Sequence, residues 1–284
     1  MEMWDKCAFP VNSEYLKGRK CYAGLDLSST EDMSAFVLVF PPDDPKDEDD
    51  KYIILPFFWI PEDAMRRRVL KDKVPYNQWA LEKRTDGHGR RAVVDVNAVS
   101  NNGNNSGDGN IGNTQMTDGE NWLLVTDGEV INYNYIQQKI EELNEIYNIV
   151  EIAFDRWGAV LLAQNLLDAG LNMGQFGQGY KSMSPPSKEL MRLVLQKRIA
   201  HGGNPILRWH MDNIVVRSDP AGNIKPDKVK ATEKIDGAVA TIMALDRAIR
   251  NEGKESVYNT RGALIIDLNH PDGYYYSDSD DDKN

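Results

Sequence analysis

The sequence is poor in features that define several classes of protein. It contains no apolar run near the ~20 residues that a membrane-spanning helix requires. Its N-terminus lacks a basic start followed by an apolar stretch, so no secretory signal is readable. Cysteine is scarce, and Cys7 and Cys21 have neither C-x-x-C spacing nor a nearby histidine, which argues against a disulfide framework or a zinc site. We therefore expect a cytoplasmic protein with plain thiols and no membrane partner.

Histidine chemistry and phosphate-loop chemistry are also missing. The four histidines show no metal-type spacing and are not expected to be catalytic; they are His88, His201, His210 and His270. No G-x-x-x-x-G-K-[ST] motif occurs, which excludes an ATPase of the phosphate-loop class.

The acidic charge is concentrated in two short segments. The net charge of the 284 residues is -11, of which residues 43–50 contribute -5 and residues 278–283 contribute -3, leaving -3 for the rest. Blocks of like charge are usually solvated loops or tails. The overall acidity therefore does not exclude a nucleic-acid partner.

The pattern of apolar residues indicates one α/β domain with a mixed sheet. Residues 20–41 read as a hairpin and residues 51–61 as a third strand, followed by two basic helices in residues 62–83. Residues 84–121 are rich in Gly, Asn and Asp and predict a flexible insertion.

Strands and helices alternate in the second half of the chain. We expect helices over residues 132–147, 157–169, 187–200 (capped by Ser187) and 232–250, and strands over 149–154 and 171–176. Residues 204–228 read as strands around a D-P-A-G-N turn. This predicts a lead-in (1–19), a domain (20–252) and an extension with an acidic tail (253–284).

Three aspartates are placed where strands or helices would direct them to one point. Asp26 lies inside an apolar strand, and Asp155 ends another strand just before a helix, where ligands of open α/β sheets gather. At ~100° per residue, Asp236 shares the apolar helical face of Ala240 and Met243. We expect all three carboxylates to face inward, although a single such aspartate is more often a helix cap or turn former.

Inward carboxylates repel one another unless cations neutralise them. Mg²⁺ prefers oxygen ligands, and two such ions ~3.5–4 Å apart can hydrolyse a phosphodiester. Asp32 is a possible auxiliary ligand, with an exposed turn acid as the alternative. Basic side chains could hold the polyanion by its phosphates, and the candidates are Lys181, Lys188, Arg192, Lys228 and Lys230.

Several ordered segments of the chain resemble the nuclease domain of the large terminase subunit of tailed bacteriophages. They are A-G-L-D-L-S-S, V-P-Y-N-Q-W-A, G-E-V-I-N-Y-N-Y-I, I-A-F-D-R-W-G-A, M-S-P-P-S-K-E-L, H-G-G-N-P-I-L-R-W with a following Asn213, and K-I-D-G-A-V-A-T-I-M-A-L-D-R-A. The resemblance implies a ribonuclease H-like fold and carries the acidic triad onto Asp26, Asp155 and Asp236.

The same resemblance implies an activity and partners. These are endonucleolytic cutting of concatemeric double-stranded DNA with two Mg²⁺ or Mn²⁺ ions, in the cytoplasm of the infected bacterium. The family usually joins this nuclease to an ATPase domain and works with a small terminase subunit and a portal. The long Gly/Asn-rich insertion departs from the family pattern.

Other functions remain open at this stage. A junction resolvase or transposase would also place three carboxylates on this fold, and an actin-like ATPase shares the core but needs a second related domain that the sequence does not show. A catalytically silent module that docks on portal or small terminase is the alternative from another class.

Deleting residues 100–115 is predicted to leave thermal stability nearly unchanged, because this stretch has almost no apolar side chains to bury. Comparison of melting temperatures for the intact and the shortened chain checks this. A large drop would show that the insertion is packed structure.

Overall fold

A computed structural model describes residues 1–28, 33–47, 49–72, 74–81, 122–231, 233–251, 264–265 and 275–276. The chain forms two compact units, Met1–Ile249 and Arg250–Asn284. In the second unit the described residues are mainly a short antiparallel pair, β10 (Leu264–Ile265) and β11 (Tyr275–Tyr276). The insertion predicted at 84–121 and Asp32 lie outside the described residues. The domain boundaries given above stay a prediction.

A mixed sheet forms the centre of the first unit. The strands β1 (Lys20–Asp26), β2 (Ser34–Phe40) and β3 (Tyr52–Pro61) are antiparallel neighbours. Next to β1, β5 (Asn148–Phe154) pairs in parallel, and β6 (Met173–Gln175) pairs in parallel with β5. On the other edge, β4 (Leu124–Thr126) and β7 (Ile199–Ala200) each pair with β3 in parallel. The order is β4-β3-β2-β1-β5-β6.

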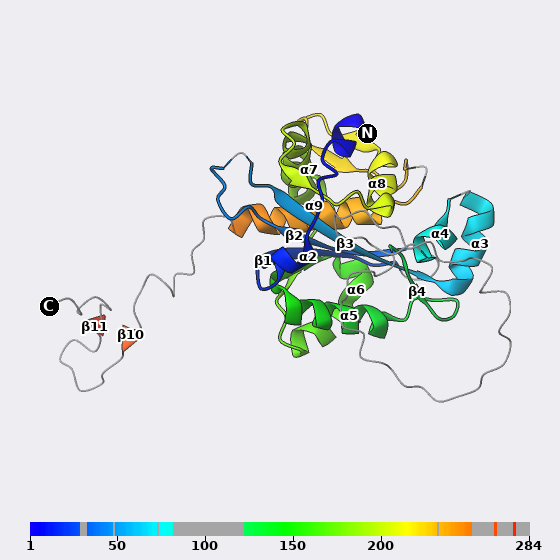
Figure 1. Ribbon diagram of the computed structural model, residues 1–284, viewed down its shortest axis with the longest axis horizontal. Coiled ribbons are helices and arrows are strands. Elements are labelled where there is room, and N and C mark those ends of the chain that lie inside the picture. Colours follow the sequence, from blue (N-terminus) through cyan, green and yellow to red (C-terminus); the bar gives the residue numbers. More distant parts are fainter. Residues whose placement is uncertain are drawn as a thin grey trace. The chain divides into compact units, whose positions relative to one another are not determined.

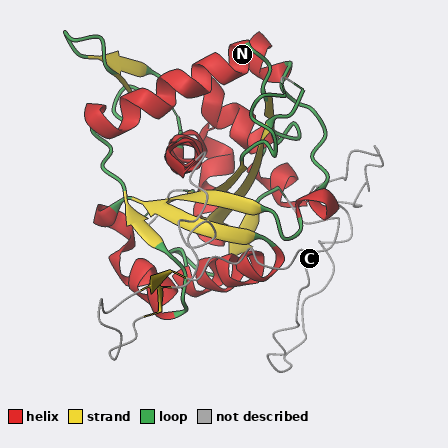
Figure 2. Ribbon diagram, turned by 90° about the vertical axis from the view of Figure 1, so that its left-hand side faces the viewer, coloured by secondary structure: helices red, strands yellow, loops and turns green. Residues whose placement is uncertain are grey.

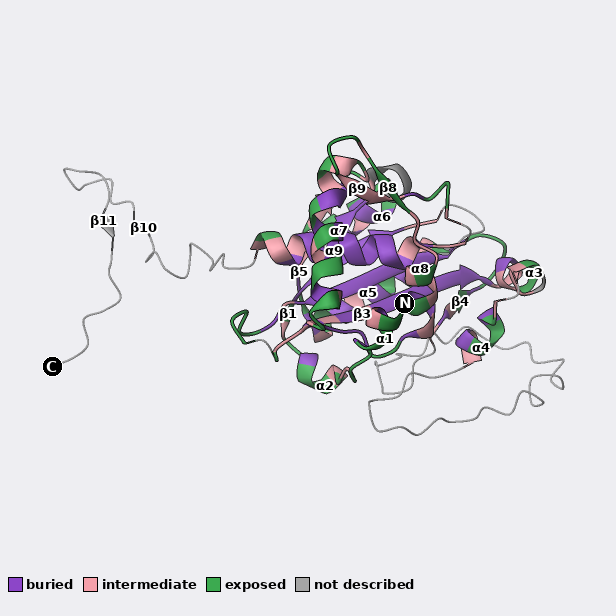
Figure 3. Ribbon diagram, turned by 90° about the horizontal axis from the view of Figure 1, so that it is seen from above, coloured by how far each residue is buried: buried purple, intermediate pink, exposed green. Residues whose placement is uncertain are grey.

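Helices cover both faces of this sheet (Figure 1). One face packs against α5 (Tyr133–Ile146) and α6 (Arg156–Asp168), and the other against α9 (Asp236–Asn251). Figure 2 shows the sheet between these layers, with α7 (Tyr180–Leu195) farther out on the α9 side. Figure 3 shows that the central strands and α9 are mostly buried. The expected architecture, a mixed central sheet flanked by helices, is confirmed.

Alternation of side chains assigns each strand residue to one layer. In β1, Ala23 and Leu25 belong to the α5/α6 core, whereas Tyr22 belongs to the α9 core. The β1–β5 pairing contains a register shift between Cys21 and Tyr22, where one additional β5 residue bulges. The central strands thus carry two separate cores, one on each face.

Short elements complete the first unit. The helices α1 (Glu2–Asp5) and α2 (Ser13–Leu16) precede the sheet, and α3 (Glu62–Asp72) and α4 (Tyr76–Leu81) follow β3, as the sequence predicted for the latter two. Within the described part of the chain, no helix is both long and apolar enough to cross a bilayer.

The helix predicted over residues 187–200 was placed wrongly. Instead of starting at a Ser187 cap, α7 begins at Tyr180 after Gly179, runs through Pro185 and Pro186, and ends at Leu195 rather than near residue 200. An internal proline costs roughly 3 kcal/mol in a helix. The helix persists because a continuous apolar face crosses the prolines, including buried Met183, Pro186 and Leu190.

The prediction for residues 204–228 was only half right. Residues predicted as a strand form α8 (Pro205–Asp212), because Asn204 accepts hydrogen bonds from the Ile206 and Leu207 N–H groups and proline starts the helix. The expected turn is present and joins β8 (Val216–Ser218) to β9 (Ile224–Pro226).

The contact between β1 and α9 is very close at Gly24. A Cβ atom there would lie 2.0 Å from the Ala240 carbonyl oxygen and 3.0 Å from the Ala244 nitrogen, both backbone atoms of α9. Only glycine allows the helix to approach the strand this closely.

A second close contact fixes the start of α9. His210, at the end of α8, is fully buried, and its Nδ1 accepts a hydrogen bond of 2.8 Å from the Gly237 N–H. Burial lowers the pKa of His210 to about 3, and the nearby Lys234 acts in the same direction. The ring is therefore neutral at physiological pH and serves as an acceptor.

We predict that Gly24→Ala destabilises the protein by about 2 kcal/mol or more, since the methyl group would overlap the α9 backbone. Urea unfolding checks the change. Gly177→Ala is the matched control, because the nearest atom to its Cβ would be Ser182 Oγ at 3.6 Å. A Gly24→Ala variant as stable as this control would contradict the packing described.

We predict that His210 makes the protein less stable as pH falls below about 6.5. The unfolded chain binds a proton there, whereas the folded chain does so only near pH 3. The loss is about 2 kcal/mol between pH 8 and pH 5. Unfolding of wild type and His210→Asn at both pH values measures it, because the stability advantage of wild type should shrink by that amount. His201, whose pKa burial also lowers, is present in both proteins. An advantage independent of pH would be evidence against a neutral His210.

Candidate functional site

Two of the predicted carboxylates lie at neighbouring strand ends. Asp26 is the last residue of β1, and Asp155 directly follows β5. Because Leu25 pairs with Phe154, the two aspartates occupy adjacent positions at the ends of these parallel strands. Strand alternation places Asp26 on the side of Tyr22 and Gly24, and Asp155 on the side of Ala153, which packs in the α9 core. Both carboxylates thus belong to the α9 face of the sheet.

The third carboxylate comes from the helix on that face. Asp236 is the first residue of α9, where the positive end of the helix dipole favours an acidic side chain. Its side chain is 16% exposed, and the His210 contact with the next residue fixes this end of the helix. Asp236 thus lies at the start of the helix that packs on the face of the sheet to which Asp26 and Asp155 belong.

A lysine lies between two of these carboxylates. Lys228 Nζ is 2.7 Å from Asp26 Oδ2 and 3.6 Å from Asp236 Oδ1. The Gln178 side-chain amide, from the loop between β6 and α7, is 3.5 Å from the other Asp26 oxygen. The site thus joins β1, the start of α9 and two loops.

Burial and charge oppose each other at Asp26. Burial raises its pKa, Lys228 lowers it, the negative charge of Asp155 raises it and the Gln178 hydrogen bond lowers it, with a net increase. Burial lowers the pKa of Lys228, but Asp26 and Asp236 outweigh that effect and raise it. The effect of Asp155 on Asp26 indicates that the two aspartates belong to one electrostatic site.

The donor set suits a hard divalent cation. Asp26, Asp155 and Asp236 offer only oxygen atoms, and a cationic ammonium group already lies between two of them. As the side chains stand, no three His, Cys, Asp or Glu side chains of the described residues are grouped closely enough to hold one ion together.

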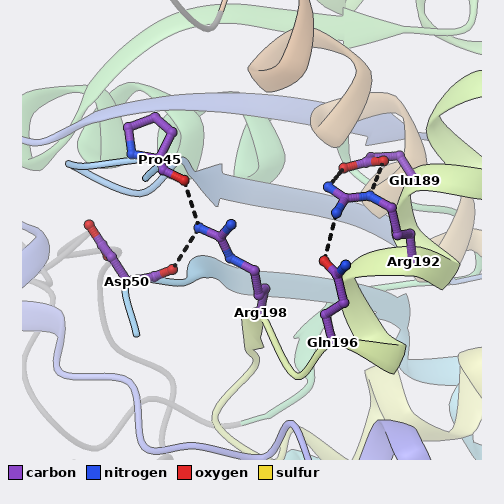
Figure 4. A network of polar contacts seen from close by, with 6 residues as sticks. All are labelled: Pro45, Asp50, Glu189, Arg192, Gln196 and Arg198. Carbon is purple, nitrogen blue, oxygen red and sulfur yellow. Dashed lines mark hydrogen bonds and ion pairs between the residues drawn. The ribbon is translucent and has the colours of Figure 1, made fainter. Parts of the chain in front are cut away.

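The predicted phosphate-binding residues lie on two elements. Lys181, Lys188 and Arg192 are exposed and follow one face of α7, whereas Lys228 and Lys230 lie in the turn after β9. Arg192 is held by Glu189, with 2.8 Å between Nε and Oε2, and by Gln196 (Figure 4). Their contact with DNA stays a prediction.

Arg198, also drawn in Figure 4, has a structural role. Its Nη2 donates to the backbone carbonyls of Pro45, Asp47 and Asp50, so it fixes the acidic loop between β2 and β3.

Sequence reasoning missed three contacts of this site. It placed Lys228 among the phosphate-binding residues without foreseeing its ion pairs, and it foresaw neither the contact of Gln178 with a carboxylate nor the contact of His210 with the start of α9. The glycines on both sides of Gln178, directly after a parallel strand, were the available signal. No pattern in the sequence indicates which lysine of the 225–234 segment reaches the carboxylates.

Comparisons with known proteins point to one family. The family model described as "Terminase large subunit, endonuclease domain" matches residues 1–104 and 93–252. The large terminase subunit of Enterobacteria phage HK97 is 31% identical over 249 residues, which cover 87% of this chain and 40% of that protein. The Escherichia coli K12 protein YmfN is 30% identical over 265 residues, 89% of this chain and 49% of that protein.

A solved structure shows the same relation. The crystal structure of the HK97 large terminase superposes with a TM-score of 0.65 at 30% identity, over 87% of this chain and 42% of that one. The chain thus spans less than half the length of these relatives. The family match, which covers most of the chain, shows that it belongs to the endonuclease-domain family of terminase large subunits.

Proposed function

We propose that this chain is a divalent-metal-dependent endodeoxyribonuclease that cuts concatemeric double-stranded DNA during genome packaging. The observation that carries the proposal is the convergence of Asp26, Asp155 and Asp236 on one face of the sheet, with a cation held between two of them. Membership of the terminase endonuclease-domain family supports it.

Asp26, Asp155 and Asp236 are the residues that would hold two Mg²⁺ or Mn²⁺ ions. When bound, such ions activate a water molecule and stabilise the leaving oxygen of a phosphodiester. The burial of Asp26, which is 3% exposed, keeps its carboxylate away from bulk water and strengthens its attraction for a cation.

Other residues of the chain would hold the substrate. The exposed lysines of α7, Lys181 and Lys188, offer positive charge to the phosphate backbone without reading its sequence. Lys225 lies 5.4 Å from the centroid of the Tyr180 ring at the start of this helix, which places a further cation beside an aromatic face. DNA affinity is therefore expected to depend on salt.

The proposed partners and cellular location are those implied by similarity to large terminase subunits. The chain spans 40% of the HK97 large subunit, so packaging would require the remaining part of such a motor. An ATPase domain, a small terminase subunit and a portal are the proposed partners, in the cytoplasm of the infected bacterium.

We predict that Asp155→Asn lowers metal-dependent cleavage of supercoiled plasmid by roughly 100-fold or more, about 2.7 kcal/mol of transition-state stabilisation. The substitution removes a ligand charge but keeps the shape of the side chain. Nicked and linear DNA are measured after incubation with Mg²⁺, with Mn²⁺ and with EDTA.

Asp168→Asn is the matched control, since Asp168 is an exposed acid at the far end of α6. Circular dichroism establishes that both variants are folded. Cleavage in EDTA, or by Asp155→Asn at the wild-type rate, would refute the proposal. Absence of cleavage by folded wild-type protein would favour a silent docking module.

A further inference from the structure

We propose that Lys228 is an internal competitor for the metal: its ammonium group occupies the cation position between Asp26 and Asp236 in the metal-free protein, and divalent ions must displace it to bind. This inference rests on the proposed function, because it assumes that the three carboxylates are the metal ligands. It adds a residue that sets metal affinity without being a ligand.

The contacts of Lys228 are those expected of a substitute cation. Its Nζ is 2.7 Å from Asp26 Oδ2 and 3.6 Å from Asp236 Oδ1, so it neutralises carboxylates from two different elements. The Asp26 side chain is only 4% exposed, and an uncompensated charge there would be costly. An ammonium group and a divalent ion cannot use the same oxygen lone pairs, and their like charges repel. Binding of one therefore excludes the other.

The backbone that carries Lys228 is fixed. The preceding residue, Asp227, is 6% exposed and donates its N–H to the Val215 carbonyl oxygen over 2.8 Å. Its Oδ1 accepts from the Val229 N–H at 3.1 Å and the Lys230 N–H at 3.3 Å. These bonds hold the turn in place, and none of them involves Asp26, Asp155 or Asp236.

The side chain of Lys228, in contrast, can rotate away from the carboxylates. It is 43% exposed although its ammonium group contacts buried Asp26. A four-carbon stem with several rotatable bonds can swing the charge into solvent while the turn keeps its place. Displacement therefore needs rotation of one side chain and no rearrangement of the fold.

The lysine also protects the metal-free site. With three carboxylates on one face and no metal, mutual repulsion would favour opening of the start of α9 away from β1. Lys228 joins these two elements across the site. It keeps the ligands in place and, in doing so, weakens the apparent affinity for metal.

Binding of Mn²⁺ to the protein without DNA tests the inference. Isothermal titration calorimetry on wild type, Lys228→Met and Lys230→Met gives the dissociation constants directly. We expect Lys228→Met to bind Mn²⁺ about 10-fold more tightly than wild type and to melt at a lower temperature without metal. Lys230→Met removes the same charge from the same turn, and Lys230 makes no ion pair with any other residue that the structure describes. It is expected to bind within about twofold of wild type.

Each result supports or overturns the inference. Equal or weaker Mn²⁺ binding by Lys228→Met would overturn it, and so would an equal gain in both lysine variants, which would reflect net charge alone. Lys228→Gln gives a second measurement if the methionine variant is poorly folded. Failure of wild type and both variants to bind Mn²⁺ would overturn the proposed metal site as well. Metal-dependent cleavage by wild type together with unchanged binding by Lys228→Met would overturn only the role of the lysine.

Discussion

The approach of α9 to β1 is the constraint on which the rest of the site depends. Gly24 allows the Ala240 carbonyl to lie where a Cβ atom would be, so the helix rests directly on the strand. This depth places the first residue of α9, Asp236, within reach of a lysine that also contacts Asp26 at the end of β1. His210 fixes the same end of the helix from its other side through the Gly237 N–H. A loosely packed helix would separate the carboxylates.

The cost of burying charge explains the composition of the site. Asp26 is among the most buried acids of the described chain, and Lys228 and Gln178 both contact it. The same physical requirement, compensation of negative charge in a poorly solvated place, supports both the lysine that is present and the metal that we propose. The two cations differ in what they can do: an ammonium group stabilises the fold, whereas a divalent ion also polarises a phosphodiester.

Much of this arrangement could be predicted from the sequence, because strand periodicity and the positions of Asp26 and Asp155 are local properties. The errors came from segments where tertiary packing overrides local signals. The helix was expected to begin only at Ser187, but buried side chains on both sides of Pro185 and Pro186 keep α7 continuous from Tyr180. The apolar residues of α8 resemble a strand in sequence, but the Asn204 cap starts a helix there. The contact of Lys228 with Asp26 joins residues 202 positions apart and has no local signature.

The bulge in β5 decides which way Asp155 points. Ile149 and Ile152 both face the α5/α6 core, so Val150 and Glu151 fall together on the opposite side, where Glu151 pairs with Arg247 of α9. Strict alternation from Ile149 would have directed Asp155 into the α5/α6 layer, away from Asp26. The face to which this carboxylate points therefore depends on whether the number of residues between Ile149 and Asp155 is odd or even. Many side chains of β5 can therefore be exchanged, whereas the insertion or deletion of a single residue in this strand would direct the Asp155 carboxylate to the opposite face of the sheet.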